Sequence, residues 1–270
     1  RRWINQANPA LASLITEAVG EGWLRDLDRL KGLERYAGDT GFLDRLGAIK
    51  RQNKLRLVRH VAENQRIKVN PDTLFDVQCK RMHEYKRQLL NVLHVAHLYL
   101  RIVDDGEQIT PRTHLFSGKA APGYWMAKEI IHLINAVAST VAQDRRAAGQ
   151  LSCVFIPDYR VSVAEWLIPS ADVSEQISTA GLEASGTGNM KFAMNGALTV
   201  GTWDGANIEM AEHIGEENMY IFGLRAEEVE AWRRDRYEPF RVAEGSPALK
   251  RVLDAIAQGR FGRTPGQFAG

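Results

Sequence analysis

The stretch Glu183-Ala-Ser-Gly-Thr-Gly-Asn-Met-Lys-Phe-Ala-Met-Asn195 holds the residues with the clearest capacity for chemistry. Gly186 and Gly188 allow positive φ and let the backbone approach a ligand closely. The apolar residues from Lys191 onward predict a short helix that Gly196 ends. A glycine-rich turn before a helix offers unpaired N–H groups to an anion, and we expect Lys191 in the first helical turn, beside that anion.

A lysine beside a phosphate-binding turn suits a Schiff base with pyridoxal 5′-phosphate, because the turn would hold the cofactor's phosphate. The alternative for any Gly-x-Gly sequence is a solvated lysine that follows a flexible loop. The hypothesis of a covalent cofactor site at Lys191 therefore needs support from the rest of the chain.

A second group of candidates is Lys80-Arg-Met-His-Glu-Tyr-Lys-Arg87, directly after a strand predicted at 74–79. Lys80 and Arg81 stand at the strand end, and Lys86 stands in the helix predicted next. Arginine binds phosphate with a forked geometry, and lysine supplies a point charge. The alternative is a solvated basic helix face. The position favours a binding role, because open α/β sheets bind ligands beyond the carboxyl ends of their strands.

Polar residues also follow two later strands. Pro157-Asp-Tyr-Arg160 comes after a strand predicted at 151–156, where the alternative is the capped start of a helix. Glu175 and Glu183 have seven residues between them, a pattern that recurs in retaining glycosyltransferases built from two Rossmann-type domains. Two glutamates at any one spacing are common, so the pattern gains weight only from Ser185-Gly-Thr-Gly188 after it.

The elements that must position these residues alternate between strand and helix. Strands are predicted at 74–79, 113–117, 151–156, 172–177, 197–202 and 219–222, and helices at 84–103, 124–146, 162–168 and 191–195. This alternation implies a parallel sheet with right-handed crossovers, which is an α/β doubly wound fold.

The flanking segments are predicted to be mostly helical. Helices at 9–19, 23–36 and 42–64 precede the sheet, helices at 226–232 and 247–257 follow it, and 262–270 is expected to be a loop. The apolar side of the long helix comprises Leu43, Leu46, Ile49, Leu57 and Val61. We therefore expect one domain over 1–270, with a helical lead-in at 1–70, a Rossmann-like core at 71–223 and a helical and loop tail at 224–270.

Composition excludes several classes of protein. Apolar residues make up 44% and charged residues 25% of 270 residues, as in ordinary globular proteins. A net charge of +2 gives no reason to expect nucleic-acid or membrane partners, and no apolar run is long enough to span a bilayer. Cys79 and Cys153 lie in apolar strand-like runs, so we expect buried free thiols and a cytoplasmic location. No Cys/His spacing predicts a metal site.

Taken together, these motifs are similar to those of the α-glucan phosphorylases (glycogen, starch and maltodextrin phosphorylases). The 183–195 string resembles their pyridoxal-phosphate attachment site residue for residue, and Lys80–Asn91 resembles their "KRIHEYKRQLLN" segment, with Met82 in place of Ile. The resemblance covers nearly the whole chain. It implies the C-terminal half of a two-domain glycosyltransferase-type fold, so that this chain is an incomplete catalytic domain whose partner is an N-terminal domain.

The resemblance also implies roles for individual residues. It implies that Lys191 attaches the cofactor, and that Arg81 and Lys86 hold the substrate phosphate. The cofactor pocket would further comprise Lys80, Trp3, Tyr159, Arg160, Gly186, Thr187 and Gly188. Glu183 and Ser185 would bind sugar hydroxyls, and Gly186, also assigned to the substrate site, would donate its backbone N–H to phosphate, as would Thr187 and Gly188.

The activity that the resemblance implies is phosphorolysis. Inorganic phosphate would cleave the terminal α-1,4-glucosidic bond of a glucan to give glucose 1-phosphate, in an enzyme that is usually a homodimer. The cofactor's phosphate and the substrate phosphate must then lie close together. With about −1.5 charge on each, ~6 Å apart at an effective dielectric of about 20, their repulsion is roughly 6 kcal/mol. Cations at one strand end would offset it.

Two alternatives stay open at this stage. A sugar-nucleotide-dependent retaining glycosyltransferase of the same fold would keep the two glutamates but would not need Lys191. A non-catalytic fragment would keep the sequence without an assembled site.

Overall fold

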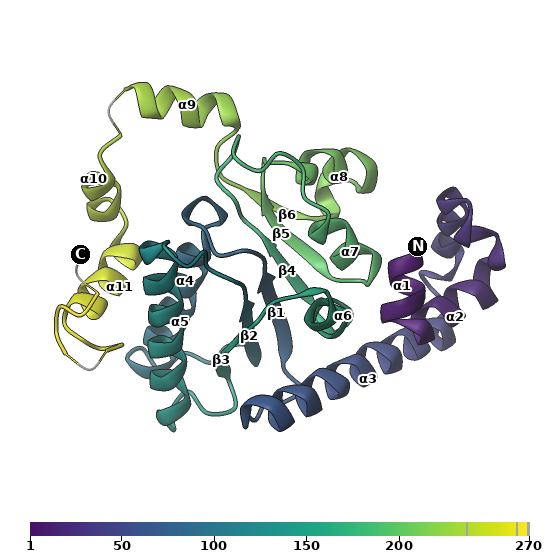
Figure 1. Ribbon diagram of the computed structural model, residues 1–270, viewed down its shortest axis with the longest axis horizontal. Coiled ribbons are helices and arrows are strands. Elements are labelled where there is room, and N and C mark those ends of the chain that lie inside the picture. Colours follow the sequence, from purple (N-terminus) through teal and green to yellow (C-terminus); the bar gives the residue numbers. More distant parts are fainter. Residues whose placement is uncertain (236, 263, 269–270) are drawn as a thin grey trace.

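The computed structural model describes residues 1–235, 237–262 and 264–268. Its centre is a parallel six-stranded sheet in the order β3-β2-β1-β4-β5-β6 (Figure 1). The strands are β1 (Leu74–Cys79), β2 (Arg112–Ser117), β3 (Leu151–Ile156), β4 (Val173–Gln176), β5 (Leu198–Thr202) and β6 (Tyr220–Phe222). The predicted α/β doubly wound sheet is confirmed, and each predicted strand corresponds to one of these.

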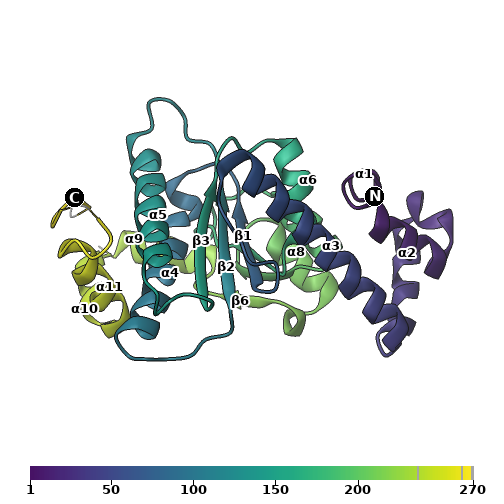
Figure 2. The same ribbon diagram turned by 90° about the horizontal axis from the view of Figure 1, so that it is seen from below.

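Helices cover the two faces of the sheet in separate groups (Figures 1 and 2). One face carries α4 (Gln88–Val103), α5 (Trp125–Gln143) and α11 (Pro247–Ala257). The other carries α3 (Thr40–Gln65), α6 (Val161–Ser170), α7 (Gly188–Met194) and α8 (Ala206–Ile214). The remaining helical elements are α1 (Arg2–Ala7), α2 (Pro9–Val19), the 3₁₀ helices η1 (Glu21–Leu24), η2 (Leu27–Tyr36), η3 (Glu84–Lys86) and η4 (Glu216–Asn218), and α9 (Ala226–Arg234) and α10 (Pro239–Glu244). No helix of the described residues is both long and apolar enough to cross a lipid bilayer.

Residue alternation along β1 explains how the sheet separates two environments. Phe75, Val77 and Cys79 are buried on the side of α3 and α6, together with apolar residues of β2 and β3. The intervening residues Asp76 and Gln78 are also buried, but they point to the opposite face, as the period of two in a strand requires. A strand that is buried on both faces is typical of a parallel sheet.

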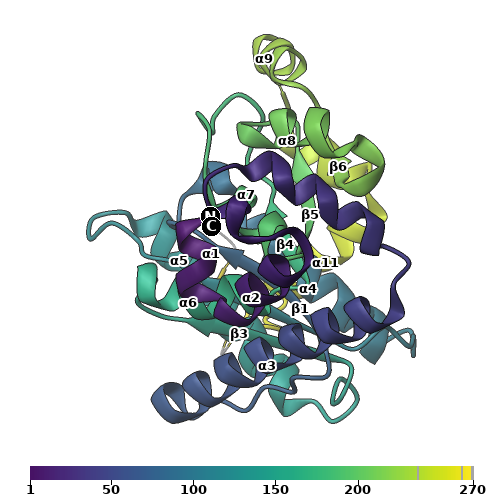
Figure 3. The same ribbon diagram turned by 90° about the vertical axis from the view of Figure 1, so that its right-hand side faces the viewer.

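The N-terminal helices are fastened to α7 by buried polar side chains. The Lys50 ammonium, on α3, donates to the carbonyl oxygens of Ala171 at 2.5 Å and Asn195 at 2.8 Å. Asn8 donates to the Asn195 side chain at 3.0 Å and accepts from Asn53 at 3.1 Å. Figure 3 shows α1 beside α7, with α3 crossing the view below them. The lead-in thus has a fixed position relative to the helix that carries Lys191.

Some predicted helices differ from the structure. The helix predicted at 23–36 is two 3₁₀ helices, because the Asp26 carboxylate accepts from the Asp28 N–H at 3.1 Å and so begins a new element. The helix predicted at 84–103 is interrupted at Arg87, whose φ of +59° is left-handed and separates η3 from α4. Leu43 was wrongly placed on the apolar side of α3, since it is 43% exposed.

Other differences concern ends of elements. The helix predicted from Lys191 begins three residues earlier, at Gly188, so that Lys191 lies in its last turn and not in its first. Among the described residues, the helices that were not predicted are α1, α8, α10 and the 3₁₀ helix η4. Of the predicted loop at 262–270, residues 263, 269 and 270 lie outside the described part of the chain.

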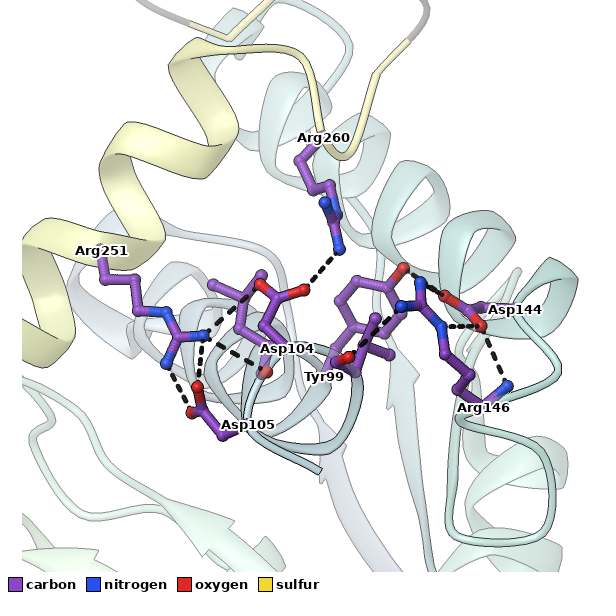
Figure 4. Close-up of polar contacts among 9 residues, drawn as sticks. Tyr99, Asp104, Asp105, Asp144, Arg146, Arg251 and Arg260 are labelled. Atoms are coloured by element: carbon purple, nitrogen blue, oxygen red, sulfur yellow. Dashed lines mark hydrogen bonds and ion pairs between the residues drawn. The ribbon is translucent and has the colours of Figure 1, made fainter. Parts of the chain in front are cut away.

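The C-terminal helix α11 is joined to the end of α4 by ion pairs (Figure 4). Arg251 pairs with Asp105 at 2.6 Å, and Arg260 pairs with Asp104 at 2.8 Å. Exposed pairs of this kind contribute little individually. The larger contribution comes from apolar burial, because Phe261 is fully buried with its ring 5.5 Å from that of Tyr99.

Two carboxylic acids, Asp76 on β1 and Glu175 on β4, are buried on the face of the sheet that α4 covers. Burial raises the pKa of Asp76 to about 7, and it raises the pKa of Glu175 well above its usual value, with the Asp76 charge as the second cause. Glu175 therefore keeps its proton and donates a hydrogen bond to the Asp76 carboxylate. Burial lowers the pKa of His94 to about 4 and also lowers that of His114, which lies 3.6 Å from Asp76.

We expect Asp76→Asn to change the pH dependence of stability. The folded Asp76 binds its proton more tightly than the unfolded one, so the wild-type free energy of unfolding loses this contribution as pH rises from about 4 to about 7. The variant should therefore gain stability relative to wild type by on the order of 2 kcal/mol between about pH 5 and pH 8 in urea unfolding. A difference between the two proteins that does not vary with pH would contradict this account.

Asp105→Asn is the matched control with the opposite sign. The Arg251 hydrogen bond lowers the pKa of Asp105, so the wild-type contribution from this exposed group is present at neutral pH and is lost in acid.

Candidate functional site: a cationic pocket at the carboxyl ends of β1 and β4

A pocket of about 240 Å³ opens where the strand order reverses between β1 and β4. Ligands bind at such switch points in open α/β sheets. We call it the switch-point pocket; its lining residues are Cys79, Lys80, Arg81, Lys86, Tyr159, Gln176, Ser178, Glu183, Ser185, Gly186, Gly188, Asn189, Asp204 and Asn207. These residues come from the loops that follow β1, β3, β4 and β5, so the sheet topology brings them together.

Cations dominate the β1 side of the switch-point pocket. Lys80 donates to the Gln176 side chain at 2.8 Å, and burial together with the Lys86 charge lowers its pKa to about 8. Lys86 is buried and forms an ion pair with Glu183. Arg81 lies exposed at the rim. Two lysines that repel one another in a buried position indicate a site that is suited to a multiply charged anion.

Buried amide side chains hold the lysines in place. Gln78 donates to the Lys86 carbonyl at 3.1 Å and accepts from Asn91 at 3.0 Å. Asn207 donates to the Gln176 carbonyl at 2.8 Å and so supports the strand end that binds Lys80. This support explains why polar residues occupy buried positions on β1 and α8: each has a hydrogen-bond partner.

The glycine-rich loop has the geometry that the sequence predicts at one of its two glycines. Gly186 has a φ of +87°, which favours glycine, whereas Gly188 is the first residue of α7. Asn189 is buried and donates to the Asn207 side chain at 3.0 Å, so it links the loop to α8. The loop therefore lines the pocket with exposed or half-buried residues, and the hydrogen bond between Asn189 and Asn207 attaches it to α8.

Lys191 and Trp3 lie beside the pocket and not in its lining. The Lys191 ammonium is 5.8 Å from the centre of the Trp3 ring. Its charge is one of several smaller effects that lower the pKa of the Cys79 thiol against the larger, opposite effect of burial. Burial raises the pKa of Cys79 to about 11 and also raises that of Tyr159, 3.7 Å away. Lys191 is thus within electrostatic reach of Cys79, which lines the pocket.

Besides Lys191 and Trp3, two further predicted cofactor residues, Arg160 and Thr187, are not brought into the pocket lining. Arg160 is exposed and donates to Asp158 and, at 2.8 Å, to Ser162. Thr187 is exposed at the start of α7. Glu175 is separated from Glu183 by the sheet itself, because it faces α4 while its neighbour Gln176 faces the pocket. The two glutamates of the repeated pattern therefore do not act at one site.

Several lining residues were missed from the sequence: Cys79, Gln176, Ser178, Asn189, Asp204 and Asn207. A signal existed for Asp204 and Asn207, because both follow the carboxyl end of a predicted strand, as Lys80 does. Among the residues described, no three His, Cys, Asp or Glu side chains are grouped as metal ligands.

The residues present fit pyridoxal 5′-phosphate. The buried cations Lys80 and Lys86 match a phosphate, and the charge of a primary amine, Lys191, acts on Cys79 in the same lining. The buried Trp3 Nε1 has no hydrogen-bond partner within the described residues, which leaves a donor for a bound molecule.

Comparison with known proteins gives the family. Residues 1–269 match the family model of the carbohydrate phosphorylases. The chain belongs to this family. It is 52% identical over 262 residues to liver glycogen phosphorylase of Homo sapiens and 51% identical to glycogen phosphorylase of Synechocystis, covering 97% of this chain and 31% of each relative. Glycogen phosphorylase of Chlamydia pneumoniae is 52% identical over the same length, with 32% covered.

The predicted resemblance to the phosphorylases is thus confirmed. The chain spans about a third of the length of these relatives, so it corresponds to one part of such a protein.

We expect Gly205→Ala to destabilise this phosphorylase-family chain through the wall of the pocket. Gly205 has φ +53° and ψ −138°, and a Cβ there would lie 2.7 Å from the Ser185 carbonyl oxygen. The free energy of unfolding in urea should fall by about 1–3 kcal/mol, as for other residues forced into rarely populated conformations. Gly38→Ala is the control, because a Cβ there meets no atom within 4 Å. Equal effects of the two substitutions would contradict the close approach.

Proposed function

We propose that this chain is part of a pyridoxal-phosphate-dependent glycosyltransferase that cleaves terminal α-1,4-glucosidic bonds with inorganic phosphate and releases glucose 1-phosphate. The observation that carries the proposal is the convergence of Lys80, Arg81, Lys86 and Glu183 in one pocket, whose lining residue Cys79 the Lys191 charge also reaches. A site with buried cations and one sugar-binding carboxylate suits a reaction between a phosphate and a sugar.

In this proposal the cations divide between two phosphates. Lys80 would bind the phosphate of the cofactor, while Arg81 and Lys86 would bind the substrate phosphate. Arg81 is exposed at the rim, where a freely exchanging anion can enter, and Lys80 is held deeper by Gln176. The backbone N–H groups of Gly186, Thr187 and Gly188 would add hydrogen bonds to phosphate oxygens.

Glu183 and Ser185 would bind hydroxyl groups of the terminal sugar. When Lys86 turns to a phosphate, the Glu183 carboxylate becomes free to accept a hydrogen bond from a sugar. Trp3, Tyr159 and Arg160 would surround the cofactor ring. The cofactor supplies an ionisable phosphate that can exchange a proton with the substrate phosphate.

The remaining partners follow from the same proposal. The substrates would be an α-1,4-glucan and inorganic phosphate, and the rest of a longer polypeptide would supply the other wall of the cleft, in a homodimer. Buried free thiols at Cys79 and Cys153 suit a cytoplasmic location, where thiols stay reduced. A sugar-nucleotide glycosyltransferase is the weaker candidate, because it has no need of the Lys191 amine, whose charge reaches Cys79 in the pocket lining.

Incubation with pyridoxal 5′-phosphate followed by borohydride reduction should attach the label to Lys191, as peptide mapping would show. Lys191→Arg should abolish the stoichiometric label, because guanidinium does not form the covalent link. Lys128→Arg removes an exposed lysine on α5 and should leave the label in place. Labels scattered over surface lysines, with none enriched at Lys191, would contradict the cofactor proposal.

In the complete phosphorolytic protein, Arg81→Ala should raise the KM for inorganic phosphate by about 10-fold or more while the cofactor stays bound, since one charge-assisted hydrogen bond to the substrate is lost. Phosphate saturation curves and cofactor absorbance measure the two effects separately. Arg145→Ala, at an exposed arginine after α5, is the control. An unchanged KM in the Arg81 variant would contradict the role of that residue.

A further inference from the structure

Asp204 is a buried carboxylate at the back of the switch-point pocket, two residues after the end of β5. It is only 4% exposed, and its two oxygens accept three hydrogen bonds. Oδ1 accepts from the Gly181 N–H at 2.9 Å, while Oδ2 accepts from the Glu183 N–H at 3.0 Å and from the Ser178 hydroxyl. All three donors belong to the segment that leads into the glycine-rich loop.

Few apolar contacts hold that segment in place. Gly181, Leu182, Ala184 and Ser185 are exposed, so apolar packing does not define the backbone around Glu183. A second fastening comes from the residues next to Asp204, because the Ala206 N–H donates to the Ser185 carbonyl at 2.8 Å. The backbone on both sides of Glu183 is therefore attached to one turn, 204–206.

The charge of Asp204 is compensated locally. Burial lowers the pKa of Arg87, and the Asp204 charge opposes that effect, so the two groups interact. Arg87 also donates to the Ile177 carbonyl at 2.6 Å. A carboxylate with three donors and a nearby guanidinium is well suited to a buried position. A carboxamide would place an NH₂ group against at least one of the same donors, which leaves that donor unpaired.

We infer that Asp204 is a positioning residue for sugar binding: it holds the backbone of Glu183 so that the Glu183 carboxylate meets Lys86 and the sugar site. The functional half of this inference, that Asp204 acts on sugar binding, rests on the proposed function, which assigns Glu183 to the sugar. The structural half, that Asp204 holds the backbone of Glu183, does not depend on the proposed function. Asp204 itself touches neither phosphate nor sugar in this scheme.

Hydrogen exchange on the 270-residue chain tests the structural half. In the unsubstituted protein the Gly181 and Glu183 amides should exchange slowly although their residues are not buried. In Asp204→Asn they should exchange at least about 10-fold faster, while amides of β1 stay protected. Asp105→Asn, the same chemical change at an exposed site, should alter neither. Unchanged exchange at both amides in the Asp204 variant would overturn the inference.

Kinetics of the complete protein test the functional half. Asp204→Asn should lower kcat/KM for the glucan by up to about 100-fold, the loss typical of a misplaced binding group, with cofactor content unchanged. In a Glu183→Gln background the same substitution should cost less than about twofold, because Asp204 acts through Glu183. Equal losses in both backgrounds would show a merely structural role and overturn the inference.

The two experiments distinguish a failure of the proposed function from a failure of the inference about Asp204. If the unsubstituted complete protein shows no phosphorolysis, the proposed function fails, and the exchange rates of Gly181 and Glu183 still decide whether Asp204 holds the loop. If Asp204→Asn does not fold, Ser178→Ala replaces it. That variant removes one donor to the same carboxylate and should show the same non-additivity with Glu183→Gln, with additive losses counting against the inference.

Discussion

Repulsion between Lys80 and Lys86 is the constraint on which the site depends. Both ammonium groups are taken from water at the end of one strand, and the lowered pKa of Lys80 records the cost of doing so. Glu183 pairs with Lys86, whereas the other acid of the pocket, Asp204, is occupied by three donors. The pocket lining holds three cations, Lys80, Arg81 and Lys86, against these two carboxylates, so it keeps an excess of positive charge that a bound phosphate would relieve. Gln78, Gln176 and the amides behind them serve to keep that charge in place.

The sheet supplies this arrangement through the alternation of side chains on β4. Gln176 faces the pocket and accepts from Lys80, while Glu175, one residue earlier, faces α4 and shares a hydrogen bond with Asp76. A single strand thus presents a neutral amide to the cations and a protonated acid to the opposite core. An ionised carboxylate in the position of Gln176 would neutralise the cations that the anion needs. The alternation of side chains on β4 therefore determines the net charge of the pocket.

Residue patterns predicted the sheet well because most strands contain a short run with apolar residues between turn residues, and the carboxyl-end rule then indicated Lys80, Arg81 and Lys86. The same reasoning failed where tertiary hydrogen bonds decide the backbone. Arg87 adopts a left-handed conformation that no propensity favours, and it donates to a carbonyl on another strand end. Asp204 could be located by the same rule, but its partners come from a loop about 20 residues earlier, which periodicity cannot pair.

The position of Trp3 is the clearest case of a feature that only the folded chain defines. Its ring meets Lys191 because Lys50, Asn8 and Asn53 attach the N-terminal helices to the residues at the end of α7. These bonds are buried, so breaking one leaves an unpaired polar group and costs about 1–3 kcal/mol. The amine that would carry a cofactor and the ring that would cover it are thus coupled through the lead-in. The proposed cofactor end of the site would exist only when that lead-in is docked, which would make the helices before the sheet part of the site.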